Sequence, residues 1–402
     1  MIDVEIILAI IFVVILGIVL IINRKKLEIQ KVLFPIIYII MYRTKLGLKL
    51  MDKIANKYRS LVQFFGFISI GIGFVGMAFI SISIIMVIIK LIFTPHAASS
   101  DMVLVLPFTN ITGIGYLPFT SWLIAIFVLA VVHEFSHGVV ARAHNVEIKS
   151  SGFAVLGILA PIIPAAFVEP NEEKLKKEKE IVQYSIFAAG PVSNIFLALV
   201  FFLLMIAVFN PIEARLMEPV GFSFDITNTS LPAGVAGLQS GMIVNSFNYK
   251  NINDSTYFLN QMQYCVKPEQ QVTFGTANAT YAATTIASPN DATRGFVGVN
   301  NIKNEVRVKQ KYEESVFVKI FFWFKDLFKW LFLLNLFIGL ANLMPLGIVD
   351  GGRMLQLLLS STMNDQKKAM KVWGFIGLLF LIFILFGLIT NYVGNPFRYL
   401  FG

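Results

Sequence analysis

Long apolar runs constrain this chain more than any other feature of its sequence. A membrane-spanning helix needs about 20 mostly apolar residues. The sequence contains six runs of about that length or longer, at residues 4–22, 61–90, 121–143, 181–209, 327–347 and 372–393. Only 14% of the residues are charged, whereas soluble domains have roughly 25%. We therefore predict an α-helical polytopic membrane protein with about six spans, and we exclude a soluble enzyme.

Two further apolar stretches are not expected to span the bilayer. Val32–Met41 is too short for a membrane-spanning helix and contains Pro35. Phe153–Val168 is interrupted by one glycine and two prolines. The first long run, Val4–Ile22, lacks a small-residue cleavage site and is followed by three basic residues. It is therefore predicted to be a retained span and not a removed signal peptide.

The distribution of lysine and arginine predicts the orientation. Residues 24–59 contain ten basic and two acidic side chains, so this segment is expected on the cytoplasmic side of the cell membrane. Alternation then places 91–120 and 210–312 outside and 144–180 and 351–371 inside. Four Asn-x-Ser/Thr acceptor sequences agree, because all fall in segments assigned outside. They begin at Asn110, Asn228, Asn253 and Asn278.

The basic segment also contains an amphipathic pattern. Leu46, Leu50, Ile54 and Tyr58 recur at helical spacing, opposite several lysines. This pattern is typical of a helix that lies on the membrane surface. The net charge of +9 is explained by such lipid-facing and topology-setting residues, so we expect the lipid bilayer and no nucleic acid as a partner.

The third long run contains the sequence H-E-x-x-H, from His133 to His137. On a helix the two imidazoles lie one turn apart on one face and can bind one zinc ion, with Glu134 beside them as the general base. Ionisable residues inside a membrane span are costly and mark functional sites. The single cysteine, Cys265, excludes a cysteine-built metal site and is expected to be inert. We predict one Zn²⁺ per chain.

A catalytic zinc site commonly takes three protein ligands, so a third one must come from another segment. Asp350 is the best candidate, because it follows a helix break at Pro345 and precedes Gly351 and Gly352, which let backbones approach closely. Its expected depth in the membrane matches that of the HExxH sequence. Asp326 lies near the opposite face and is excluded as a ligand.

Residues 210–312 form one large hydrophilic block, rich in Thr, Ser and Asn. Short alternating runs within it, such as Gln271–Phe274 and Gly295–Val299, predict a small, mainly β domain. It separates two membrane parts. We divide the chain into a first span with a basic segment (1–60), a membrane domain with the HExxH span (61–209), this domain, and a C-terminal membrane domain (313–402).

An HExxH sequence in one span, combined with a distant N-x-x-P-x-x-x-x-D-G-G from Asn342 to Gly352, resembles the site-2 protease family of intramembrane zinc metalloproteases. Three other segments strengthen the resemblance. Ala188–Asn194 resembles the family's A-G-P-x-x-N sequence, and Gly152–Val168 resembles its re-entrant β-loop. Leu231–Gly241, together with the strand at Arg294–Val299, resembles a PDZ domain, which implies an inserted extracytoplasmic PDZ-like unit.

The resemblance also implies roles for individual asparagines. It places Asn342 at the catalytic site, where an amide can hold the substrate backbone or an oxyanion, with Asn335 as a second candidate. Asn194 and Gly190 are interpreted as helix-packing residues. Two histidines outside the HExxH sequence, His96 and His144, are interpreted as surface residues.

The function implied is a zinc endopeptidase that cuts membrane-spanning segments of other membrane proteins, in regulated intramembrane proteolysis. Two alternatives stay open. A membrane transporter or zinc-handling protein would use the same cluster, but it should show inverted repeats. A catalytically inactive membrane adaptor would use its PDZ-like domain, but it should have lost Glu134. The substrate, the regulating signal and the oligomeric state do not follow from the sequence.

Overall fold

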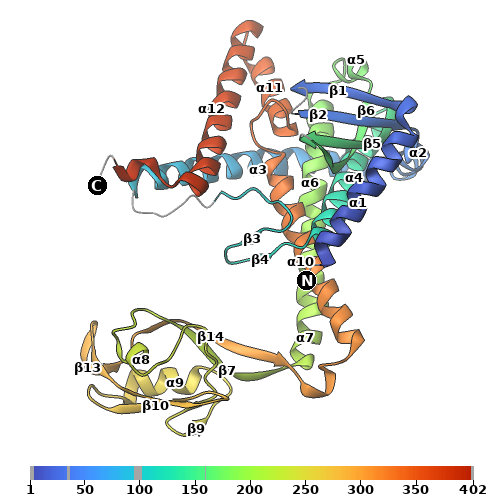
Figure 1. The fold of residues 1–402 in the computed structure, drawn as a ribbon. Coiled ribbons are helices and arrows are strands. Elements are labelled where there is room, and N and C mark those ends of the chain that lie inside the picture. The colour runs from blue at the N-terminus through green and yellow to red at the C-terminus, as the bar shows by residue number, and fades with distance from the viewer. Residues whose placement is uncertain (1–3, 34–36, 95–101, 159, 400–402) are drawn as a thin grey trace. The chain divides into compact units, whose positions relative to one another are not determined.

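The computed structural model describes residues 4–33, 37–94, 102–158 and 160–399. It divides into two compact units, and Figure 1 labels most of their helices and strands. The first, called here the membrane unit, consists of Met1–Met205 and Phe324–Gly402. The second, called the inserted unit, is Ile206–Trp323. Each is described by itself.

Five helical segments among the described residues are long and apolar enough to cross a membrane, which makes this a multi-pass membrane protein. They are α1 (Val4–Ile22), α3 (Arg59–Phe93), α4 (Phe119–Ala143), Glu180–Leu216 and α12 (Gln366–Val393). The fourth comprises α6 (Glu180–Leu204), a π-helical turn at Met205–Phe209, and α7 (Asn210–Leu216). These five segments overlap five of the six predicted runs.

The sixth predicted run, 327–347, is only partly helical. α10 (Val316–Ala341) ends at Ala341, and Pro345 falls in the turn that follows. α10 also carries an ion pair, because the Lys329 ammonium lies 2.6 Å from the Asp326 carboxylate. This agrees with the expectation that Asp326 is not a site residue, and the sixth span itself stays a prediction.

α3 shows how the helices of the membrane unit pack. Glycines line one face of it, and a Cβ on Gly73 would lie 3.0 Å from the Met354 side chain and 3.2 Å from that of Ala188. Small residues let α6 and α11 (Asp350–Thr362) approach this face closely. Its other face exposes large apolar side chains, such as Val75 at 70%. That exposure is expected where lipid covers the protein.

A four-stranded antiparallel sheet joins the N-terminal segment to the chain after α4. It consists of β1 (Leu27–Leu33), β2 (Ile37–Thr44), β5 (Ile148–Ile158) and β6 (Ala160–Pro170), in that spatial order. β6 packs along α4 (Figure 1). The prediction that Phe153–Val168 is not a spanning helix is confirmed. The other stretch, Val32–Met41, is extended wherever the structure describes it.

The remaining elements of the membrane unit are short. They are α2 (Leu48–Lys57), β3 (Asn110–Ile111), β4 (Gly115–Tyr116), α5 (Glu172–Leu175) and two 3-10 helices at Arg24–Lys26 and Pro396–Tyr399. The predicted amphipathic helix is confirmed as α2. It buries Met51 and Ala55 against α4, whereas Leu50 of the predicted apolar stripe is 52% exposed.

The inserted unit combines short antiparallel strands with small helices. Its strands are β7 (Met217–Ile226), β8 (Ser246–Phe247), β9 (Lys250–Asn251), β10 (Gln271–Gly275), β11 (Thr280–Thr284), β12 (Ile286–Ser288), β13 (Asp291–Phe296) and β14 (Val299–Val308). Two short helices lie among these strands, α8 (Pro232–Val235) and α9 (Thr256–Asn260), and α9 runs into a π-helical turn at Gln261–Cys265. Five buried phenylalanines dominate its core, namely Phe222, Phe224, Phe247, Phe258 and Phe274.

Candidate metal centre

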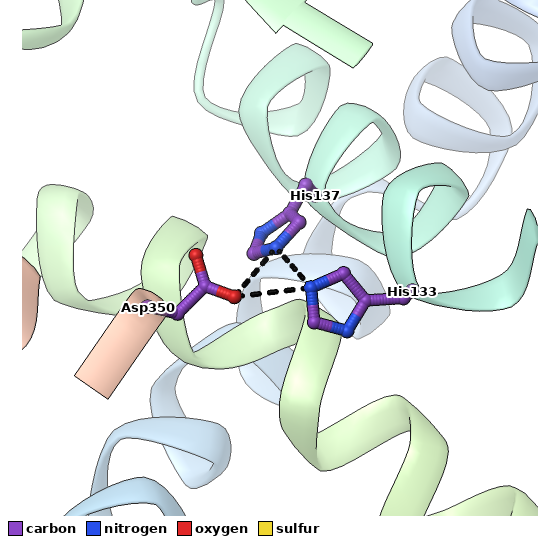
Figure 2. A group of neighbouring side chains, drawn as sticks. All are labelled: His133, His137 and Asp350. Atoms are coloured by element: carbon purple, nitrogen blue, oxygen red, sulfur yellow. Dashed lines mark hydrogen bonds and ion pairs between the residues drawn. The ribbon is translucent and has the colours of Figure 1, made fainter. Parts of the chain in front are cut away.

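Three predicted ligands meet inside the membrane unit. His133 and His137 lie one turn apart on α4, and Asp350 begins α11 (Figure 2). The two histidine Nε2 atoms are 3.1 Å apart. Asp350 Oδ2 lies 3.0 Å from His133 Nε2 and 3.3 Å from His137 Nε2. Residues more than 200 positions apart in the sequence thus direct three potential ligand atoms at one point.

These separations fit a zinc ion. Zinc bonds of about 2.0–2.1 Å in tetrahedral geometry put neighbouring ligand atoms about 3.3 Å apart. The three atoms form a triangle of similar size. Two imidazoles and one carboxylate occupy three of the four zinc positions and leave the fourth for water. Many catalytic zinc sites have this number of protein ligands.

A backbone carbonyl fixes the tautomer of His137. Its Nδ1 lies 2.6 Å from the carbonyl oxygen of Ile186, on α6. A carbonyl can only accept a hydrogen bond, so Nδ1 must carry the proton. The lone pair of Nε2 then faces Asp350 and His133. This arrangement prepares the ring for metal binding, as outer hydrogen bonds to ligand histidines generally do.

Asn194 adds a contact with His133 to its role in helix packing. The side chain is fully buried on α6, and its amide lies 3.2 Å from His133 Nδ1. The amide oxygen Oδ1 has no hydrogen-bond partner with Nδ2 in this position. The opposite amide orientation would let Oδ1 accept a hydrogen bond from Nδ1–H of His133. Nε2 of His133 is then free to bind a metal.

Gly190 is also a site residue and not merely a packing residue. A Cβ at this position would lie 2.3 Å from His137 Nε2 and 2.7 Å from His133 Nε2. Both distances are far shorter than van der Waals contact. Only glycine therefore lets α6 pass beside the two imidazoles, and the sequence signal for this role was the A-G-P-x-x-N segment itself.

Two glycines position Asp350. A Cβ on Gly351 would lie 2.2 Å from the Leu343 carbonyl oxygen, and one on Gly352 would lie 1.8 Å from that of Leu346. The turn after α10 therefore folds directly onto the first turn of α11, as the glycine pair predicted. At the N-terminus of α11 the carboxylate of Asp350 is also favoured by the helix dipole.

Glu134 connects the metal centre to the sheet. Its Oε2 accepts a hydrogen bond of 2.9 Å from the backbone N–H of Val168, on β6. The side chain lines the same cavity as the three ligands. β6 therefore holds the carboxylate at a fixed place beside the metal position, where a general base is needed.

The cavity at this site has a volume of about 320 Å³. Its lining combines apolar side chains, including Phe167, Phe187 and Ile348, with Asn342 and the metal-site residues. Asn342 thus lines the same cavity as the three potential ligands. Asn335 does not line this cavity, because it is fully buried and its amide donates to the Leu331 carbonyl oxygen at 2.7 Å.

The other singled-out residues lie elsewhere. His144 was expected at the surface, but it is partly buried and packs edge-on against Phe67, with ring centroids 5.6 Å apart. His96 lies outside the described residues. Cys265 is exposed in the inserted unit.

Comparison with known proteins places this chain in a family. The sequence profile described as "Peptidase family M50" matches residues 121–384. That span contains His133, His137 and Asp350. The chain is also 26% identical over 310 residues to "Uncharacterized protein MJ0971" of Methanocaldococcus jannaschii, which covers 77% of this chain and 74% of that protein.

Proposed function

The chain belongs to peptidase family M50, a family of membrane metalloproteases, and from this premise we propose that it is a zinc endopeptidase that cuts membrane-spanning segments of other membrane proteins. The observation that carries the proposal is the triangle of His133, His137 and Asp350 inside an apolar helical unit. These three residues would hold Zn²⁺. When bound there, the ion supplies a Lewis acid that polarises the scissile carbonyl and lowers the pKa of a water molecule.

Glu134 is the general base in this proposal. Its carboxylate takes a proton from the attacking water and passes it to the nitrogen of the leaving amine. The hydrogen bond from Val168 to Oε2 keeps the carboxylate oriented while the proton moves. Asn342, in the same cavity, donates from its amide to the substrate backbone or to the oxyanion.

β6 provides a place for the substrate. It is the last strand of the four-stranded sheet and pairs only with β5 among the described strands. A spanning substrate helix has no free amides, so it must unwind before cleavage. The unwound stretch can add to the free edge of β6, where main-chain hydrogen bonds hold it beside Glu134.

The wider role follows from the resemblance to site-2 proteases. We place the protein in the plasma membrane, with the metal centre toward the cytoplasm and residues 210–312 outside. The PDZ-like domain would select or exclude substrates, in regulated intramembrane proteolysis. These assignments rest on the lysine distribution and on the PDZ-like segments of the sequence.

Glu134→Gln tests the proposal. The amide keeps the shape of the side chain but cannot take a proton, so cleavage of a membrane-embedded substrate should fall about 10²- to 10⁴-fold. Bound zinc, measured on the same preparation, should stay at one per chain. Glu173→Gln, an exposed change of the same kind on α5, is the matched control and should leave both values unchanged.

Two results would contradict the proposal. Normal cleavage by zinc-loaded Glu134→Gln would show that Glu134 is not the base. A zinc-loaded wild-type protein that cuts no membrane substrate would favour the zinc-handling alternative.

A further inference from the structure

α2 buries one face and exposes the other. At 100° per residue, its first face contains Leu48, Met51 and Ala55, of which Met51 and Ala55 are buried against α4. The second face carries a row of exposed lysines, namely Lys45 just before the helix, Lys49, Lys53 and Lys57. Two exposed leucines lie beside this row: Leu50 on the helix, at 52%, and Leu46, two residues before the helix begins, at 65%. Exposed leucines beside these lysines would not be needed on a surface that meets only water.

The chain connection places α2 at the membrane boundary. α2 ends at Lys57, and the candidate span α3 begins two residues later at Arg59. On the outer face of α3 the first apolar residues are already strongly exposed, with Leu61 at 68% and Phe64 at 63%. Lipid must cover these side chains, so α2 lies where hydrocarbon gives way to headgroups.

Contacts with α4 fix the rotation of α2 about its axis. Met51 packs against Gly138, since a Cβ on that glycine would lie 2.6 Å from the methionine sulfur. Asp52 forms an ion pair of 3.0 Å with Arg142, also on α4. Both contacts lie within five residues of His137 along α4. The lysine row therefore points in a direction set by the metal-site helix.

The lysines of this row lack counter-charges in the protein. None of Lys45, Lys49, Lys53 or Lys57 forms an ion pair with any residue that the structure describes, whereas Lys174 on α5 pairs with Glu147 at 2.6 Å. A row of unpaired cations next to exposed leucines matches the two layers of a membrane interface, where phosphates lie above acyl chains. An acidic protein partner would account for the lysines but not for the leucines beside them.

We propose that α2 is a docking surface for anionic phospholipids, with the lysine row contacting the headgroups and Leu46 and Leu50 reaching the acyl chains. Anionic lipids then gather at the foot of α3 and hold the end of α4 against the membrane surface. Attraction to an anionic surface gives about a fivefold preference per lysine.

Energy transfer from α2 to labelled lipids tests this inference. Full-length protein carries Cys265→Ser and Asn56→Cys, and the new thiol on exposed Asn56 receives a donor dye. The protein is placed in phosphatidylcholine vesicles with traces of acyl-labelled phosphatidylglycerol or acyl-labelled phosphatidylcholine. We expect the anionic lipid to be enriched about fivefold or more around the donor, relative to the neutral lipid. Salt at 0.5 M should largely remove the enrichment.

Two triple variants separate the α2 surface from general charge effects. Lys49→Gln, Lys53→Gln and Lys57→Gln together should bring the enrichment to parity. Lys176→Gln, Lys177→Gln and Lys179→Gln remove the same charge from exposed positions near α5, among glutamates, and should leave it unchanged. Equal transfer to both lipids in the parent protein would overturn the proposal. So would an equal loss of enrichment in both triple variants, because net charge alone would then explain it.

Discussion

The metal centre and the core of the inserted unit are built in opposite ways. Around the metal centre, polar groups are buried among apolar helices, and His133, His137 and Asn194 each have a specific partner. In the inserted unit the buried cluster is apolar, and aromatic rings fill it. Burying a polar group costs free energy unless a partner compensates it. A buried polar residue with a specific partner in the apolar membrane unit therefore points to a functional site.

This difference gives the first and largest test, a change within the aromatic core. Phe258 is 2% exposed, and its ring centroid lies 4.8 Å from that of Phe222 and 5.0 Å from that of Phe247. Phe258→Ala should lower the free energy of unfolding of the inserted unit by about 3–5 kcal/mol. Amide hydrogen exchange of residues 217–308 measures this. Zinc content should not change, because the two sites share no residue.

Tyr249→Ala is the control for this change. Tyr249 is 85% exposed, so its removal should alter the free energy of unfolding by less than about 0.5 kcal/mol. If Phe258→Ala released zinc from an otherwise folded membrane unit, the contrast between two independent regions would be wrong.

The same difference decides what the sequence could predict. His133, Glu134, His137 and Asp350 were predicted because ionisable side chains stand out in apolar runs and fit a metal-ligand pattern. The structure brings the three ligands together. The helical segments were predicted for a related reason, since run length is a direct consequence of bilayer thickness.

Other features needed three-dimensional information. The pairing of β2 with β5 joins residues more than a hundred positions apart, and nothing local in either segment specifies that register. The packing roles of Gly190 and Asn194 were predicted, but their contacts with the histidines were not, because small and amide residues commonly serve helix packing alone. Their spacing from the histidines is visible only once α4 and α6 lie side by side.

The second prediction tests the tight fit at Gly190. Gly190→Ala would put a methyl group 2.3 Å from His137 Nε2, so the imidazoles must move. A displacement of about 1 Å can cost about 10²-fold at a catalytic site, and we expect zinc affinity to fall by a similar factor. Competition with a chromogenic chelator measures the affinity.

Gly71→Ala, on α3, is the matched control, because no atom lies within 4 Å of its added Cβ. It should bind zinc like the parent protein. Unchanged affinity in Gly190→Ala would mean that the imidazoles have free space which the structure does not contain.

The third prediction concerns Asn194. Asn194→Ala removes the acceptor that holds the Nδ1 proton of His133, and outer-shell changes of this kind typically cost 10- to 100-fold in metal affinity. Asn194→Asp keeps an acceptor and should retain more affinity than the alanine variant. Equal losses in the two variants would indicate a packing role instead.

The last and smallest effect comes from an ion pair on the four-stranded sheet. Its side chains are partly exposed, unlike the buried groups of the metal centre and of the aromatic core. Glu169 on β6 accepts a hydrogen bond of 2.7 Å from the Ser150 hydroxyl and pairs with Arg43 on β2. The Ser150 hydrogen bond first, and the Arg43 guanidinium after it, lower the pKa of Glu169 below its usual value of 4.5. The ion pair contributes its full stabilisation above the usual pKa of 4.5, where the carboxylate is charged in both states. This contribution is lost as the pH falls through the lowered pKa of the folded state.

Both side chains of this pair are about one third exposed, so solvent screening limits the contribution to about 1 kcal/mol or less. Glu169→Gln should lower the free energy of unfolding by that amount at pH 7 and approach the parent protein near pH 3. Thermal unfolding of the two proteins in the same detergent, from pH 3 to 7, measures the difference. A gap that stays constant over this range would show that Glu169 acts by packing, as the buried phenylalanines do, and not by its charge.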